Sequence, residues 1–149
     1  LRRRGEYTPL PMNPDLSLWP LAAQVLLVLL LFVRLGQMKG RAKAAGLVDP
    51  AVTALDNDAW PDEVRKVANN IRNQFQVPVL FCVLTLALFA RGSADVLALI
   101  IAWIFVTSRL VHSYIHIGSN HVPNRTRAFT IGVLCVFALF GLLVRALLA

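Results

Sequence analysis

The sequence predicts an all-α membrane protein in which four transmembrane helices form one bundle. Four apolar stretches, at about 17–37, 68–90, 96–118 and 126–147, approach the ~20 residues that a helix needs to cross a bilayer core of ~30 Å. Hydrophobic residues make up 57% of the chain and the mean hydropathy is +0.63, which is more apolar surface than a soluble domain of this length could bury. A single domain over residues 1–149 accounts for the whole sequence.

The helix that follows the first apolar stretch is expected to be weakened and then interrupted. Gly36, Gly40 and Gly46 lie at or beyond the end of this stretch, and each glycine weakens a helix interior by about 1 kcal/mol. Asp49 and Pro50 come next and would interrupt any helix that continued. A long loop should therefore connect the first two membrane helices.

The second helix is expected to begin outside the lipid, before its apolar stretch. Residues 58–63 read Asp-Ala-Trp-Pro-Asp-Glu. This order places Asp58 or Trp60 as the cap, Pro61 in the first turn, and acidic side chains where the helix dipole favours them. The third and fourth helices follow after short turns.

Lysine and arginine residues favour an orientation in which the long loop and the last turn face the cytoplasm. That side carries Lys39, Arg41, Lys43, Arg65, Lys66, Arg125 and Arg127, against Arg2, Arg3, Arg4, Arg91 and Arg145 on the other side. The formal net charge of +7 suits contact with anionic lipid headgroups. Because no nucleic-acid-binding motif is present, membrane lipids rather than nucleic acid are the expected partner of this charge.

Two of the predicted helices carry polar residues along one face. These residues fall at offsets of 0, 4, 7, 8 and 11 on the second helix, and at 0, 3, 7 and 11 on the third, which in each case is a single helical face. They are Arg65, Asn69, Arg72, Asn73 and Gln76 on the second helix, and Arg109, His112, His116 and Asn120 on the third. Because one helix leaves the cytoplasmic side and the other returns to it, both stripes should reach the same membrane depth.

No carboxylate lies inside the apolar stretches to neutralise these arginines. A charged side chain at the bilayer centre costs ~3 kcal/mol unless it faces protein or water, so Arg72 and Arg109 need compensation. Guanidinium groups match carboxylate and phosphate ligands, and we therefore expect an external anion. The alternative is that these arginines reach lipid headgroups or tie helices together through backbone carbonyls.

Arg125 is the most informative of the basic residues. It follows Asn124, a natural N-cap, and so stands in the first turn of the fourth helix, where the dipole is already positive. A cation there is explained if the arginine and the helix end attract a third, negative group.

His112 and His116 have the i, i+4 spacing of a metal-binding pair. No Cys, Asp or Glu lies near them in the sequence, and Arg109, one turn away, would repel a cation. We therefore expect no metal at this position.

The basic and polar motifs resemble those of a known family. The run Arg-Leu-Val-His-Ser-Tyr-Ile-His over 109–116, followed by Asn120 and by Pro-Asn-Arg over 123–125, is similar to the third and fourth helices of the MAPEG superfamily, the membrane-associated proteins in eicosanoid and glutathione metabolism. The run Arg-Asn-Gln-Phe-Gln-Val-Pro-Val-Leu-Phe over 72–81 resembles the second helix of its bacterial branch. The resemblance spans about residues 16–147.

The resemblance implies a homotrimer in a bacterial inner membrane, with glutathione bound between protomers near the cytoplasmic face. Hydrophobic electrophiles or lipid hydroperoxides would arrive from the bilayer. Arg125 matches the arginine that stabilises the glutathione thiolate, and Arg109 opens the third-helix motif. By resemblance, Arg65 and Asn69 match the Arg-x-x-x-Asn of the second helix, and Arg34 lies in the region of another contact. Together with the polar stripes, the candidate substrate-binding residues are Arg34, Arg65, Asn69, Arg72, Asn73, Gln76, Arg109, His112, His116 and Asn120.

The sequence departs from the family pattern in two places. The second-helix Asn-x-x-Glu stands here as 69–72 or 73–76, and in both registers the acid is replaced, by Arg72 or by Gln76. His112 and His116 occupy positions where the eicosanoid synthases tend to carry tyrosines. Two functions therefore remain open: a glutathione transferase or peroxidase, or a non-catalytic protein that binds a lipid headgroup or serves as an accessory subunit of a membrane complex.

Overall fold

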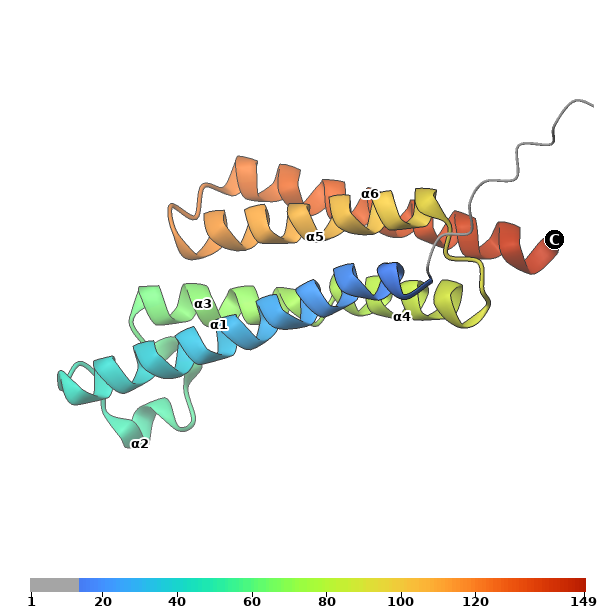
Figure 1. The fold of residues 1–149 in the computed structure, drawn as a ribbon. Coiled ribbons are helices and arrows are strands. Elements are labelled where there is room, and N and C mark those ends of the chain that lie inside the picture. The colour runs from blue at the N-terminus through green and yellow to red at the C-terminus, as the bar shows by residue number, and fades with distance from the viewer. Residues whose placement is uncertain (1–13) are drawn as a thin grey trace, which may run out of the picture.

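The computed structural model describes residues 14–149, so Arg2, Arg3 and Arg4, which entered the orientation prediction, lie outside the described residues. Long helices run side by side as one bundle (Figure 1). The elements are η1 (Pro14–Ser17), α1 (Leu18–Ala44), α2 (Pro50–Thr53), η2 (Asn57–Ala59), α3 (Asp62–Gln74), α4 (Val77–Ala90), α5 (Val96–Ile117) and α6 (Val122–Leu148). Within residues 14–149, four helical segments are long and apolar enough to cross a membrane: Asp15–Ala44, Asp62–Ala90, Val96–Ile117 and Val122–Leu148. The predicted all-α membrane fold is confirmed.

Helix α1 continues well beyond its apolar stretch, although Gly36 and Gly40 were expected to weaken it there. The helix passes through both glycines and ends at Ala44. The chain turns at Gly46, whose φ is +66°, a left-handed conformation that glycine adopts without steric cost. The helical extension is stabilised because Ala42 packs on the buried Trp60, and Lys39 Nζ lies 4.6 Å from the centre of that indole ring.

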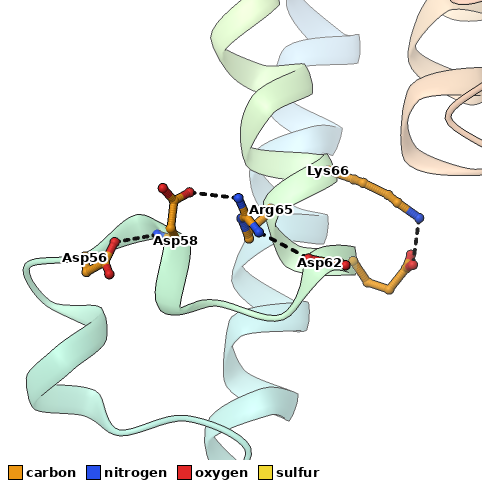
Figure 2. A network of polar contacts seen from close by, with 6 residues as sticks. Asp56, Asp58, Asp62, Arg65 and Lys66 are labelled. Carbon is orange, nitrogen blue, oxygen red and sulfur yellow. Dashed lines mark hydrogen bonds and ion pairs between the residues drawn. The ribbon is translucent and has the colours of Figure 1, made fainter. Parts of the chain in front are cut away.

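The second membrane helix begins at Asp62, with Pro61 at the N-cap position. Neither Asp58 nor Trp60 caps it, contrary to the sequence-based expectation. Asp58 instead forms an ion pair with Arg65 at 3.0 Å, and Asp62 contacts the same guanidinium at 3.2 Å (Figure 2). Trp60 is buried under α1, which holds its backbone in an extended conformation and delays the start of the helix.

This second helix is broken in the middle, which the sequence analysis did not anticipate. Helix α3 ends at Gln74 and α4 begins at Val77. Pro78 lies in the first turn of α4, where it has no N–H to give to the preceding turn. Gln76 therefore lies at the break and leaves the face that Arg65 and Arg72 share on α3.

A buried hydrogen-bond network joins α1, α3 and α5. Gln74 Nε2 donates to Asn70 Oδ1 at 3.0 Å and to Ser113 Oγ at 3.1 Å. Gln24 Nε2 donates to Gln74 Oε1 at 3.1 Å, and Ser113 Oγ donates to Asn70 Oδ1 at 3.2 Å. The network fixes the end of α3 against α1 and α5 in the interior of the bundle.

We expect Gln74→Leu to lower the free energy of unfolding by about 2 kcal/mol, because it removes three interhelical or intrahelical hydrogen bonds from an apolar interior. Thermal unfolding in detergent measures the effect. Gln37→Leu, on the exposed side of α1, is the matched control. Equal melting temperatures for the two variants would contradict a stabilising role for the network.

Helices α5 and α6 pack closely along their length (Figure 1). A Cβ atom at Gly132 would lie 3.1 Å from Ser108 Oγ, so glycine allows α6 to approach α5 beside Arg109. At the far end, Arg91 Nε and Nη2 both donate to the carbonyl oxygen of Ala146, at 2.9 and 2.6 Å. Contacts at both ends therefore set the position of α6, and with it the position of Arg125.

Candidate functional site

The start of α6 carries the central residue of the candidate site. The helix begins at Val122, with His121 at the N-cap position, so Asn124 does not cap it as expected. Pro123 lies in the first turn, which is its favoured place, and this moves the helix start toward the N-terminus. Asn124 is exposed and accepts a hydrogen bond from Arg127 Nη1 at 3.4 Å. Arg125 nevertheless remains in the first turn, as predicted.

The Arg125 side chain is half-buried and held by a neutral partner. Its Nη1 donates to Asn120 Oδ1 at 2.6 Å. In the described part of the chain, no carboxylate forms an ion pair with Arg125. The positive charge of this guanidinium is therefore not neutralised within the protomer.

Two buried histidines lie behind Arg125. His112 Nδ1 is 3.1 Å from the carbonyl oxygen of Arg125, and because a carbonyl oxygen only accepts, Nδ1 is the protonated nitrogen. The rings of His112 and His116 lie 5.5 Å apart and nearly perpendicular. Within residues 14–149, His112 Nε2 and His116 Nδ1 have no hydrogen-bond partner.

Arg109 lies deeper, between α5 and its neighbours, with 0% of its surface exposed. Its Nη2 is 3.5 Å from the carbonyl oxygen of Asn73 at the end of α3, and its guanidinium lies 5.6 Å from the centre of the Phe129 ring on α6. Its Nε and Nη1 have no partner among the described residues. A cation at a helix C-terminus is favourable, but one long hydrogen bond does not satisfy this group.

The predicted residues of the second helix form a separate, outward-facing group. Arg65, Asn69 and Arg72 line a polar cavity of about 230 Å³ whose other walls come from α1 and the long loop. The residues from α1 and the loop are Leu35, Lys39, Asn57 and Asp58, and Ala68 of α3 also lines the cavity. None of the lining residues belongs to α5 or α6. Arg34 and Gln76 are exposed and do not line this cavity.

The structure therefore brings together one part of the predicted site and not the other. One group lies around the start of α6 and consists of Asn120, Arg125, His112, His116, Arg109 and the carbonyl of Asn73. The other group, Arg65, Asn69 and Arg72, lines the separate cavity between α3, α1 and the long loop. The buried Asn70 and Gln74 were missed. Val64, Val67 and Ile71 mark the buried face of α3, and both residues fall on that face, so the apolar spacing contained the signal.

The group around α6 has the chemistry of an anion or thiolate site. Two guanidinium groups, Arg109 and Arg125, lie beside a positive helix end, and no carboxylate in the described part of the chain pairs with either. Within residues 14–149, no cluster of three His, Cys, Asp or Glu side chains has the arrangement of a metal site. The two guanidinium groups present are chemically suited to stabilise negative charge.

Comparison of the chain with known proteins gives one family match. The MAPEG family model matches residues 17–145 of the chain. Searches of curated proteins and of solved structures found no match. The matched region contains every site residue described above, so the predicted resemblance is confirmed.

Proposed function

This chain belongs to the MAPEG family, and we propose that it is a membrane-bound enzyme of the glutathione transferase or peroxidase type. The family places it among integral membrane proteins of eicosanoid and glutathione metabolism. The observation that carries the proposal is Arg125, a half-buried arginine at the positive end of a membrane helix, which has no carboxylate partner among residues 14–149. Glutathione is the proposed co-substrate.

Arg125 would act by stabilising the glutathione thiolate. Each unit by which a site lowers a thiol pKa corresponds to ~1.4 kcal/mol of preference for the thiolate, and an arginine at a helix N-terminus supplies about one or two units. The thiolate sulfur then bonds to an electrophilic carbon, either displacing a leaving group or adding to a polarised double bond whose carbanion takes a proton from solvent. With a lipid hydroperoxide from the bilayer, the sulfur takes the terminal oxygen as the O–O bond breaks, and the lipid alkoxide leaves as an alcohol after taking a proton. A second glutathione then reduces the glutathione sulfenic acid, which releases water and glutathione disulfide. The thiol proton passes to solvent.

The outward-facing cavity would hold the carboxylates of the tripeptide. Arg65 is already paired with two acids, so Arg72 and Lys39, together with the amide of Asn69, are the donors available there. This cavity shares no lining residue with the Arg125 group. In the proposed homotrimer, glutathione would lie between protomers, with the cavity of one protomer and the Arg125 group of a neighbour on either side of it.

We expect native mass spectrometry in mild detergent to show a trimer. Polar side chains exposed on α3, including Asn69 and Arg72, need cover at membrane depth, and a neighbouring protomer supplies it. A preparation that contains only monomer would contradict the shared site.

The proposed location is a bacterial inner membrane, with the long loop and the site on the cytoplasmic side. Lys39, Arg41, Lys43 and Lys66 lie at that end of the bundle, as the excess of positive charge on cytoplasmic loops requires.

A second candidate function is favoured by the missing acid. Neither Arg72 nor Gln76 supplies the carboxylate that contacts the glutathione amine in the family. A non-catalytic protein could use the same arginines for a lipid phosphate, alone or as an accessory subunit.

Conjugation of glutathione to a model electrophile by the detergent-purified protein tests the proposal. We expect turnover that saturates with glutathione. An inactive protein that retains a phospholipid through purification would favour the second candidate instead.

A further inference from the structure

Two residues, Asn120 and His112, form hydrogen bonds with Arg125. We propose that Asn120 and His112 are positioning residues, which hold Arg125 at its side-chain end and at its main-chain end without neutralising its charge. The inference rests on the proposed function, because it gives this fixed guanidinium the thiolate as its ligand.

Asn120 fixes the guanidinium. Its Oδ1 accepts from Arg125 Nη1 at 2.6 Å, and its backbone has a φ of +53°, in the left-handed region that asparagine tolerates better than most residues. Its N–H donates to the carbonyl oxygen of Ile115 at 2.7 Å, which anchors the turn to the end of α5. The acceptor is thus held in place by the backbone of the turn.

His112 fixes the main chain of the same arginine. Its Nδ1–H donates to the carbonyl oxygen of Arg125 at 3.1 Å. The imidazole is buried, and its ring centre lies 5.9 Å from that of Phe129, one turn further along α6. The first turn of α6 is therefore tied to the C-terminal part of α5.

Asn120 and His112 hold Arg125 without adding a negative charge, in contrast to the partners of Arg65. Arg65 is fixed by the carboxylates of Asp58 and Asp62 (Figure 2), which neutralise it. Arg125 is fixed by an amide and an imidazole, and its guanidinium forms no other hydrogen bond among the described residues. A free arginine loses about 2 kcal/mol of rotamer entropy when a ligand orders it. Advance fixing removes part of that cost and leaves Nε and Nη2 for the anion.

The first test changes Asn120. Asn120→Gly keeps the left-handed turn and removes the acceptor, whereas Asn120→Asp keeps the turn and the acceptor and adds a negative charge. The readout is the ultraviolet absorbance of the thiolate of bound glutathione as a function of pH. We expect its midpoint to rise by about half a pH unit in Asn120→Gly and by about one in Asn120→Asp, with kcat falling about threefold and tenfold. Asn124→Ala, one turn away and bonded to Arg127, should match the wild type.

The second test changes His112. The side-chain amide of Asn carries a donor where His112 has Nδ1. His112→Asn should therefore stay close to the wild type in kcat and in the midpoint of the thiolate titration, whereas His112→Leu should lower kcat and raise that midpoint. Arg109 and His116, the other titratable groups beside the ring, remain unchanged in both variants. If His112 only fills space, Leu should preserve function better than Asn, and that order would overturn its positioning role.

A third measurement separates this inference from the proposed function. The NMR signal of the Arg125 Nε–H, recorded without glutathione, should show a restricted side chain in the wild type and a mobile one in Asn120→Gly. If this difference in mobility is seen but the wild type shows no thiolate absorbance, the positioning of Arg125 by Asn120 stands and the thiolate is rejected as its ligand. Wild-type mobility and wild-type turnover in Asn120→Gly would overturn the inference even if the enzyme is active.

Discussion

Arg125→Ala should lower kcat for a model electrophile by about a hundredfold and leave KM for glutathione nearly unchanged. A preorganised donor to a developing or stabilised anion contributes mainly to the reacting state, and the loss of one such group costs 10²- to 10³-fold in kcat. Glutathione affinity should survive because Arg125 faces the sulfur, whereas the carboxylates of the tripeptide are held by Arg109 and by the outward-facing cavity with Lys39, Asn69 and Arg72. Steady-state kinetics with varied glutathione measures both constants.

Arg127→Ala is the control for this variant. Arg127 lies two residues further along α6, is exposed, and bonds only to Asn124 in the described chain. Its loss changes the net charge as Arg125→Ala does, and activity should remain at the wild-type level. Equal turnover in Arg125→Ala and the wild type would remove Arg125 from the mechanism.

Arg109→Leu should abolish measurable glutathione binding while the protein stays folded. Leucine retains apolar bulk at a site that is fully buried, and the arginine it replaces has two unpartnered nitrogens, so the lost contacts are few. Replacement of a poorly compensated buried charge by an apolar residue is often neutral or stabilising. The ligand, in contrast, loses one of two nearby positive charges in a low-dielectric region. Calorimetry and thermal unfolding give the two quantities.

Arg91→Leu provides the opposite pattern. Arg91 donates twice to Ala146 at the far end of α6, so its loss should lower the melting temperature and leave glutathione affinity intact. An Arg109→Leu protein that is destabilised yet binds glutathione normally would show that Arg109 serves only to connect α3 and α5.

The membrane helices followed from the sequence because length and hydropathy alone decide whether a segment spans a bilayer. Their ends did not. Local glycine penalties at Gly36 and Gly40 were outweighed by the packing of Ala42 on Trp60, which is a tertiary contact. The break between Gln74 and Val77 had Pro78 as its only local sign, and a proline in the first turn of a helix and one that interrupts a helix look alike in sequence.

The site was predictable as a set of residue types and less so as a set of contacts. The spacing placed Asn120 and Arg125 at the same end of the bundle, and the structure joins them. Helical periodicity also grouped Asn73 with Arg72, but the helix turns Arg72 outward while the Asn73 carbonyl meets the buried Arg109. One helical face that includes both residues therefore borders the outward-facing cavity at Arg72 and the bundle interior at Asn73. The sequence pattern does not distinguish these two environments, which depend on how the helices pack.

Glutathione calorimetry and lipid mass spectrometry on the same detergent-purified preparation test the central claim most directly. The account predicts heat from glutathione binding in the wild type, loss of that heat in Arg109→Leu, and no tightly retained phospholipid. No heat from glutathione in the wild type, together with a copurified phospholipid that disappears in Arg109→Leu, would contradict the transferase assignment and identify these arginines as a lipid-phosphate site.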